Sequence, residues 1–343
     1  MIHRISCRML LMTLACCLTG GSPVIADDGA LDENVRLRGG LFRQAFEDVA
    51  RKPREWTVRL IVDGEPIVFG TIVDPAGLII TKASRWNADA EVELHNGQRF
   101  KPSLVGADTV SDLALLQISA TRLTAVEWRR EEKVPVGSWV IVPGSSSMPV
   151  AVGVVGASER SIPREHGVLG ISLEDTAEGV QVSDVLPNSG AAKAGLREKD
   201  RVIRVMNEDV ATRSDLIKRV HEYAPGDTID LFIVRDGNEM QLSATLQQAL
   251  SALLNRRGIQ DRLAGDISRR RGGFPAAYQH DAVIAPVHCG GSVVDLDGKC
   301  FGINIARAGR AETYALSASV VRNVIHEIQN RANEQKSTDS KSD

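Results

Sequence analysis

Cys289 is the residue of this chain that is best suited to chemistry. It lies in the sequence Pro286-Val287-His288-Cys289-Gly290-Gly291, between a histidine and two glycines. A thiol with a pKa near ~8.5 is already a few per cent thiolate at neutral pH, so it can act as a nucleophile without full activation. Lys82, Arg85 and His288 could lower that pKa further if their side chains point at the sulfur.

Short strands and turns must position such a nucleophile. Between residues 56 and 118, segments rich in Val, Ile and Leu are separated by turn sequences such as Asp63-Gly64 and His95-Asn96-Gly97. Repeated hairpins at this spacing favour a closed antiparallel barrel. Apolar residues at helical spacing predict an amphipathic helix at 41–49 and another at 320–328, before a flexible tail at 331–343.

The Cys289 loop resembles the nucleophile loop of the trypsin-like HtrA (Deg) proteases, whose motif reads Gly-Asn-Ser-Gly-Gly-Pro. Three further stretches match that family in the right order: the strand pair before its histidine at 69–81, its aspartate strand at 111–116, and the first strand of its second barrel at 136–144. The resemblance implies a mainly β chain with a trypsin-like double β-barrel.

The same resemblance implies that the catalytic triad is degenerate. Ser84 stands where the family has its histidine base and Cys289 where it has its serine, whereas Asp112 matches the family's aspartate. A serine cannot act as the base, and losing the nucleophile or the base of such a triad costs about 10⁶ in turnover. We expect a protein without protease activity; the alternative is a peptidase of the serine-protease family that uses Cys289 as its nucleophile.

The oxyanion loop would be formed by Val287, His288 and Cys289. Val287 replaces a glycine of the family pattern. A β-branched residue does not readily adopt the unusual backbone angles that such a loop of donors requires. This substitution also argues against activity.

Residues 161–247 resemble a bacterial PDZ domain. The matching stretches are Val168-Leu169-Gly170-Ile171, Gly179-Val180-Gln181-Val182, 191–196, 200–203 and Pro225-Gly226-Asp227. In HtrA proteins the PDZ domain follows the protease, but here protease-like sequence resumes after it. We therefore expect a PDZ domain inserted between two strands of the second barrel.

A PDZ domain binds an extended peptide at a sheet edge, and N–H groups of a glycine-containing turn hold the terminal carboxylate. The resemblance assigns this turn to Val168, Leu169, Gly170 and Ile171. A side chain at position 170 could block the close approach of a carboxylate. Leu216 and Val220 lie on one face of the helix expected at 215–223, and could face either the core of the domain or its groove.

Two other patterns support weaker alternatives. His280, His288 and Cys289 are metal-ligating types, but their spacing fits no common zinc pattern, so we expect no metal and no cofactor. The connector at 248–273 carries apolar residues at helical spacing and then several arginines. This pattern predicts a docking helix and a solvated loop, with an acidic partner or a processing site as the sharper alternative.

The first 26 residues have the pattern of a cleaved secretory signal, with Arg4 and Arg8 before an apolar run and Val24-Ile25-Ala26 at its end. The run at 9–18 is shorter than the ~18 to 20 residues that span a bilayer. We expect a periplasmic or secreted protein, with lipid attachment at Cys16 as the weaker alternative. Only Cys289 and Cys300 would remain after cleavage, which excludes a disulfide scaffold but not a single pair.

The composition agrees with a folded binding protein. A formal charge of −3 on 343 residues gives no indication of nucleic-acid binding. We expect the barrels at 39–160 and 274–330 to act as a scaffold or regulator, and the PDZ domain to capture C-terminal or unfolded peptides of envelope proteins. Partners would include a second copy of the chain or an active HtrA protease in a mixed assembly, and no membrane span is expected in the mature chain.

Overall fold

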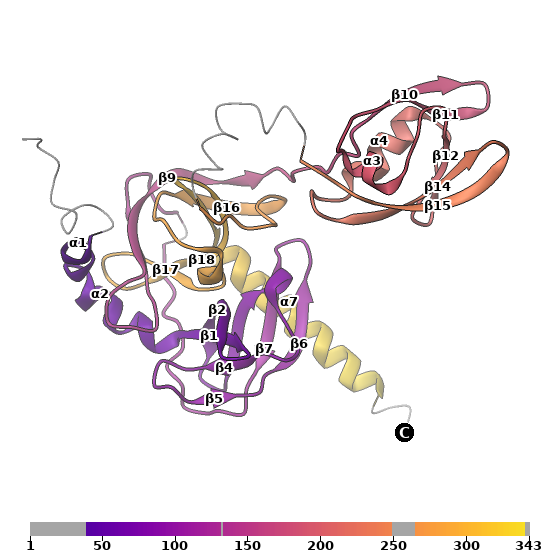
Figure 1. Ribbon diagram of the computed structural model, residues 1–343. Coiled ribbons are helices and arrows are strands. Elements are labelled where there is room, and N and C mark those ends of the chain that lie inside the picture. Colours follow the sequence, from indigo (N-terminus) through magenta and orange to yellow (C-terminus); the bar gives the residue numbers. More distant parts are fainter. Residues whose placement is uncertain (1–38, 132, 249–264, 340–343) are drawn as a thin grey trace, which may run out of the picture.

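The structure is a computed structural model, and it describes residues 39–131, 133–248 and 265–339. Strands dominate it, in two packed β units and a smaller sheet that Figure 1 shows at the upper right. The expected signal at 1–26 and Cys16 lie outside the described residues. Within the described part, no helix is long and apolar enough to cross a membrane.

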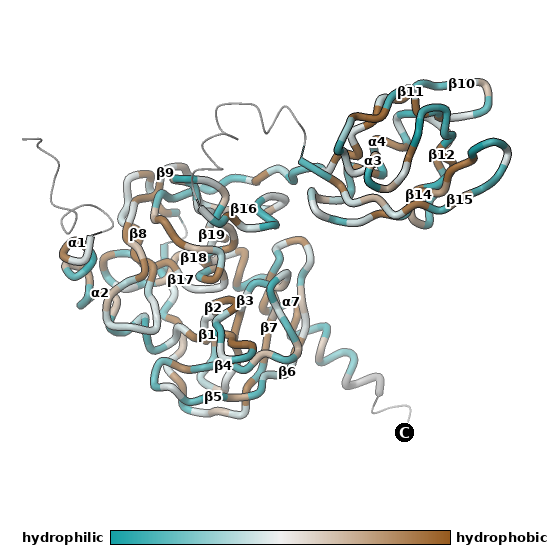
Figure 2. The backbone as a smooth tube through the Cα atoms, in the orientation of Figure 1, coloured by the Kyte–Doolittle hydropathy of each residue, from teal (hydrophilic) through white to brown (hydrophobic). Residues whose placement is uncertain are grey.

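The first unit is a curled antiparallel sheet with the strand order β5-β4-β1-β2-β3-β7-β6. Its turn at Asp63-Gly64 has φ values of 51° and 84°, the left-handed pair that a tight two-residue hairpin requires. Hydrophobic residues follow the strands, including β3 and β7 (Figure 2), and their inward side chains are fully buried. The strands are β1 (Thr57–Val62), β2 (Glu65–Asp74), β3 (Leu78–Lys82), β4 (Glu91–Glu93), β5 (Arg99–Phe100), β6 (Ser103–Asp108) and β7 (Leu113–Gln117).

The second unit is a closed barrel with the order β16-β19-β18-β17-β8-β9. Its strands are β8 (Trp139–Val142), β9 (Ala151–Ile162), β16 (Phe274–His280), β17 (Ser292–Val294), β18 (Cys300–Gly309) and β19 (Glu312–Ser317). In this barrel Ile162 of β9 pairs with Phe274 of β16, although the whole small sheet lies between them in the sequence. The small sheet is thus inserted between two neighbouring strands, which agrees with the expected trypsin-like double barrel carrying a PDZ domain.

The inserted unit orders its strands β10-β11-β12-β14-β15, with β13 beside β12. Its elements are β10 (Ile171–Thr176), β11 (Gly179–Val185), α3 (Gly190–Ala194), β12 (Arg201–Val205), β13 (Glu208–Asp209), α4 (Arg213–His221), β14 (Thr228–Arg235) and β15 (Asn238–Thr245). Helix α4 begins with a capping box in which Thr212 and Asp215 satisfy each other's backbone N–H groups. Strand β10 lies at the edge of this sheet, so one of its sides remains free to pair with another strand. Helix α4 contacts β10.

Helices close the two ends of the described chain. The amphipathic pattern near the start forms two short helices, α1 (Gly40–Gln44) and α2 (Glu47–Arg51), followed by the 3-10 turn η2 (Pro53–Trp56). Helix α7 (Ala318–Asp339) packs Val321 and Ile328 on the barrels. The prediction of a flexible tail from residue 331 was wrong as far as Asp339, because the segment contains helix-forming residues and no glycine or proline.

Candidate functional site: the degenerate cleft and the PDZ groove

Ser84 and Asp112, at two of the triad positions, are hydrogen-bonded to each other, but Lys82 also forms an ion pair with the carboxylate of Asp112. Ser84 follows β3 in the 3-10 turn η3 (Ala83–Arg85), and Asp112 precedes β7, the strand that pairs with β3. Ser84 donates its N–H to Oδ1 of Asp112 at 2.7 Å and its hydroxyl to Oδ2 at 2.9 Å. The ammonium group of Lys82 donates to the same Oδ2 at 2.7 Å. The carboxylate of Asp112 therefore forms an ion pair with Lys82 and hydrogen bonds with Ser84.

Asp112 is held in an unusual backbone conformation. Its φ is 60°, which aspartate tolerates better than most residues. Its carbonyl accepts the N–H of Ala83 at 2.8 Å, so the turn that carries Ser84 is fixed to it. The side chains of Lys82 and Asp112 are only 3% and 2% exposed. The pair is part of the core of the cleft.

Cys289 is fully buried, and its thiol meets another side chain of the protein. Oγ of Ser268 lies 3.7 Å from Sγ, within hydrogen-bond distance of the sulfur. Burial raises the pKa of the Cys289 thiol, and the positive charge of Lys82 only partly opposes this. Cys289 and Cys300 are both free thiols, and burial raises the pKa of Cys300 to about 12. A neutral, enclosed thiol is a poor nucleophile.

In the loop that would form the oxyanion hole, the backbone N–H of Cys289 already donates within the loop. Residues Pro286–His288 form the 3-10 turn η4, in which the N–H of Cys289 donates to the carbonyl of Pro286 at 3.2 Å. The following glycine, Gly290, has a φ of 86°, and a Cβ there would lie 2.1 Å from the carbonyl oxygen of Phe69. The turn is thus locked against β2, and its amide at position 289 does not point to an open site.

His288 does not act on the thiol. Its Nδ1 accepts the N–H of Ala285 at 3.0 Å, and its ring packs edge-on against Phe69, with 4.9 Å between ring centroids. Burial lowers the pKa of His288. The alternative metal site at His280, His288 and Cys289 gains no support, because Nε2 of His280 contacts Oδ1 of Asn304 at 2.9 Å. Among the described residues, no group of three potential ligands gathers.

A segment that sequence reasoning missed fills the cleft. Residues 267–270, which we call the cleft segment, return from the inserted unit towards β16. Ser268 donates its N–H to the carbonyl of Arg307 at 2.8 Å, and the N–H of Arg307 donates to Oγ of Ser268 at 2.9 Å. Lys82 reaches the carbonyl of Arg270 at 3.4 Å. The cleft segment therefore pairs with β18 directly beside Cys289.

Arg270 anchors this segment on the first unit. Its Nη2 donates to the carbonyl of Val110 at 2.7 Å, and its Nε lies 4.0 Å from Oδ2 of Asp112. The expectation of a solvated loop for 248–273 was wrong for this part, because Ser268 is buried and Arg270 half-buried. The docking helix expected before it falls on 249–264, outside the described residues. A run of arginines in a sequence indicates positive charge, but it does not indicate that these side chains will donate to backbone carbonyls.

The residues expected to bind a peptide gather in one groove of the inserted unit. A cavity of about 390 Å³ lies between β10 and α4, and its lining includes Val168, Leu169, Gly170 and Ile171 together with Leu216 and Val220. Leu216 and Val220 are buried in the core of the unit and also line the groove, so both alternatives hold in part. Gly170 has a φ of 77°, and a Cβ there would lie 2.5 Å from Cβ of Ser189, a local reason for glycine besides access for a carboxylate.

Sequence reasoning missed five residues of the groove lining: Gly167, Leu173, Leu186, Ile217 and His221. Of these, Ile217 and His221 lie four positions apart on α4, so they share one helical face, and this spacing could have identified them. His221 stacks on His166, with 4.6 Å between ring centroids. Burial lowers the pKa of His221, and the charge of His166 lowers it further. The groove is thus apolar along its length and polar at the end next to the linker.

Comparison with known proteins matches both parts of the chain. A PDZ domain family model matches residues 167–246. A probable periplasmic serine endoprotease, DegP-like, from Halomonas elongata is 22% identical over 262 residues, which cover 52% of this chain and 55% of that protein. A protein of the same description from Pseudomonas fulva is 31% identical over 158 residues, covering 44% and 31%.

A solved structure of the serine endoprotease from Yersinia pestis is 20% identical and covers 60% of this chain and 98% of that one, with a TM-score of 0.30. The chain spans about half the length of the Halomonas relative. The chain is therefore similar over about half its length to DegP-like serine endoproteases, and its residues 167–246 match the PDZ domain family.

Proposed function

We propose that this protein is an exported, proteolytically inactive relative of the DegP-like proteases that captures the C-termini of other envelope proteins in its PDZ groove. The observation that carries the proposal is the closed contact of Asp112 with Ser84 and Lys82. In a working triad the carboxylate would orient a histidine base. Here it is saturated by a hydroxyl, an amide and an ammonium group.

The surroundings of Cys289 support the inactive state. Its thiol is buried with a raised pKa, its N–H is used within η4, and the cleft segment pairs with β18 beside it. A peptide substrate would have to displace the cleft segment and its hydrogen bonds to Arg307. The alternative, a peptidase with Cys289 as nucleophile, needs both this displacement and a base.

The PDZ groove supports a binding role for extended peptides. Edge strand β10 offers backbone groups on its free side, and the turn at Leu169-Gly170 lines the groove. Leu169, Leu216 and Val220 contribute apolar surface to the groove. Peptides ending in a free carboxylate after an apolar side chain are therefore the ligands that fit.

Cleavage of unfolded casein by the mature chain, beside Cys289→Ala and an active DegP-like protease, tests the enzymatic half of the proposal. We expect cleavage only by the active protease. Cleavage by the wild-type chain that is lost in Cys289→Ala would establish the peptidase alternative.

Titration of fluorescent peptides tests the binding half. We expect a peptide ending in leucine to bind with its free carboxylate and to lose affinity when amidated. Ile217→Ser should weaken binding because Ile217 lines the groove from an exposed position, whereas its neighbour Lys218 does not line it, so Lys218→Ser is the matched control. Equal affinity for the amidated peptide would contradict the proposal.

The barrel pair would then scaffold the PDZ domain or join an active protease in a mixed assembly. The aromatic contacts between Phe42, Phe46 and Trp139 leave a partly exposed apolar cluster at one end of the second barrel. Light scattering of the chain alone and mixed with a DegP-like protease measures whether either assembly forms. A monomer under both conditions would reject this part.

A further inference from the structure

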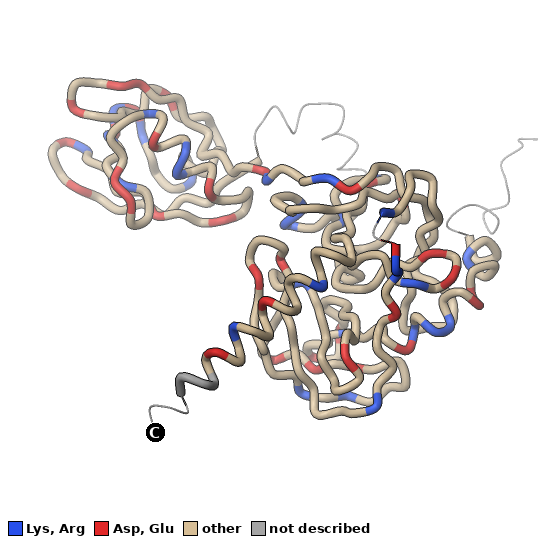
Figure 3. The backbone as a smooth tube through the Cα atoms, turned by 180° about the vertical axis from the view of Figure 1, so that it is seen from behind, with Lys and Arg blue, Asp and Glu red and all other residues tan. Residues whose placement is uncertain are grey.

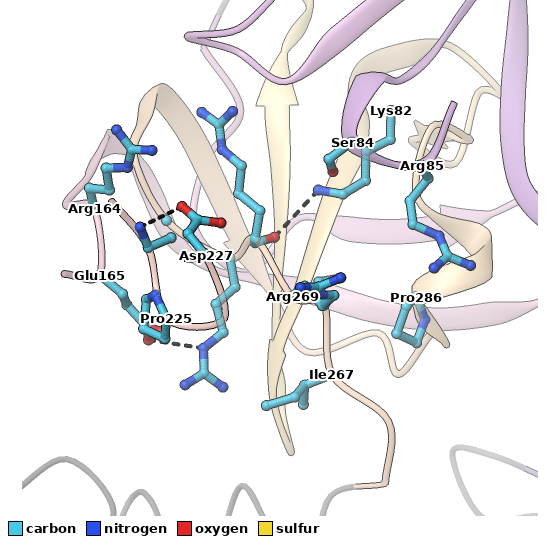
Figure 4. Close-up of a pocket in the computed structure, with 15 residues that line it drawn as sticks. Lys82, Ser84, Arg85, Arg164, Glu165, Pro225, Asp227, Ile267, Arg269 and Pro286 are labelled. Carbon is cyan, nitrogen blue, oxygen red and sulfur yellow. Dashed lines mark hydrogen bonds and ion pairs between the residues drawn. The ribbon is translucent and has the colours of Figure 1, made fainter. Parts of the chain in front are cut away.

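A strongly basic pocket lies where the inserted unit meets the barrels, apart from the PDZ groove. Its volume is about 370 Å³, within the range of ~300–1,000 Å³ that is typical of small-ligand sites. Five separate parts of the chain line it: the end of β3 with η3, the linker that leaves β9, residues 224–227 of the inserted unit, residues 267–272, and Pro286 of η4. Figure 4 shows Arg164, Glu165 and Asp227 on one side, Lys82, Ser84 and Arg85 on the other, and Arg269 between them.

The charge of this lining is unbalanced. Its cations are Lys82, Arg85, Arg164, Arg269, Arg270 and Arg271, and its carboxylates are Glu165 and Asp227. Glu165 pairs with Arg271 at 2.9 Å, and Asp227 accepts the N–H of Ala224 at 2.8 Å. Lys82 is paired with Asp112. Figure 3 shows Lys and Arg interspersed with Asp and Glu along the backbone of the described chain.

Three of these arginines have no counter-charge in the part of the chain that the structure describes. Among the residues that the structure describes, neither Arg164 nor Arg269 has an ion-pair partner, and both are exposed. The guanidinium of Arg269 reaches the inserted unit, where a Cβ on Gly226 would lie 3.3 Å from Nη2. Arg85 donates to the carbonyl of Ile67 at 3.1 Å and forms no ion pair within the described ranges 39–131, 133–248 and 265–339.

The electrostatics of Arg270 point the same way. Burial lowers the pKa of Arg270, the charge of Asp112 opposes this, and the charge of Arg164 lowers it further. Arginines that repel one another across a cavity are stabilised by an anion placed between them.

We propose that this pocket binds a phosphate group, with Arg164 and Arg269 as its main ligands and Arg85 completing the site. Guanidinium groups form planar, bidentate hydrogen bonds to phosphate and carboxylate alike. Here, however, they approach from three separate parts of the chain. A phosphate group presents three or more acceptor oxygens in different directions, whereas a carboxylate presents two in one plane. The bound group therefore joins the linker to the PDZ domain, the cleft segment and η3.

Isothermal titration calorimetry of the full mature chain with inorganic phosphate and pyrophosphate, at ionic strength held constant with sodium chloride, tests the site. We expect both to bind, and each of Arg164→Gln and Arg269→Gln to lower the affinity about tenfold. Arg130 is exposed and does not line the pocket, so Arg130→Gln is the matched control and should bind like the wild type. Both substituted arginines are exposed, so the variants should fold, which circular dichroism checks.

Sedimentation with vesicles of phosphatidic acid, against phosphatidylcholine, separates a lipid phosphate from a free one as the source. Binding to phosphatidic acid vesicles that the two arginine variants lose would assign the site to a headgroup. Absence of phosphate and pyrophosphate binding in the wild type, or equal loss in Arg130→Gln, would overturn the proposal. Binding of a tetraglutamate peptide without binding of pyrophosphate would also overturn it, in favour of an acidic protein segment.

Discussion

Replacing Lys82 with methionine should strongly destabilise the barrel pair, because it leaves the carboxylate of Asp112 buried without its nearest counter-charge, and Nε of Arg270 lies only at the longer distance of 4.0 Å. The charged groups of Lys82 and Asp112 are 2.7 Å apart, and their side chains are 3% and 2% exposed. The ammonium of Lys82 also satisfies the carbonyl of Ile305 at 2.7 Å. Removing one partner of a buried ion pair costs about 3–5 kcal/mol, so we expect a loss of that size in the free energy of unfolding.

A second substitution should recover part of the loss. In Lys82→Met/Asp112→Asn the buried charge is gone, and asparagine tolerates the φ of 60° at position 112. The double variant should therefore be more stable than Lys82→Met alone. Ser84→Ala, which removes one hydrogen bond at an exposed position, should cost only about 1 kcal/mol.

Tryptophan fluorescence in urea measures this effect on the barrels alone. The inserted unit contains no tryptophan, and all four lie in or beside the barrels: Trp56, Trp86, Trp128 and Trp139. Lys101→Met, at an exposed lysine of the same unit, is the control. A loss below about 1 kcal/mol for Lys82→Met, the size typical of an exposed pair, would refute the burial argument.

Three further predictions follow from buried groups and tight contacts. Cys289 should react with a thiol reagent far more slowly in the native Cys300→Ala chain than in the same chain in urea, since burial raises its pKa; equal rates would contradict this. Burial lowers the pKa of His280 from 6.5 to about 4, so the unfolded state binds the proton first. As the pH falls from 6.5 to about 4, the free energy of unfolding should therefore fall by about 3 kcal/mol. The urea midpoint should depend less on pH in His280→Gln than in the wild type. Gly170→Ala should weaken hydrogen-exchange protection in the PDZ domain more than Gly237→Ala, because both have positive φ but only Gly170 meets a neighbour, Ser189.

The sequence predicted the parts of the fold that local patterns determine. Turns such as Asp63-Gly64 and the inserted PDZ unit depend on local motifs and on their order along the chain. The length of α7 was underestimated because a polar helix end has no apolar stripe to indicate it. Helix propensity alone continues it to Asp339.

The contents of the cleft could not be predicted in the same way. Lys82 was considered as a group that could activate Cys289, yet it pairs with Asp112, and the choice depends on distances that only the folded chain sets. The contact of Ser268 with Arg307 joins two segments with no local pattern in common. The types of the residues in a segment do not indicate backbone pairing of this kind.

The insertion between β9 and β16 also sets an order of assembly during synthesis. Strand β9 emerges before the inserted unit, but its neighbour β16 emerges only after it. The PDZ unit has all its strands by Thr245, so it can fold while the second barrel still lacks β16 to β19. Until they arrive, β8 and β9 remain a lone hairpin with an unpaired edge, the form of β structure most open to pairing with a neighbouring chain. The strand order therefore determines the interval during which this protein is vulnerable to aggregation.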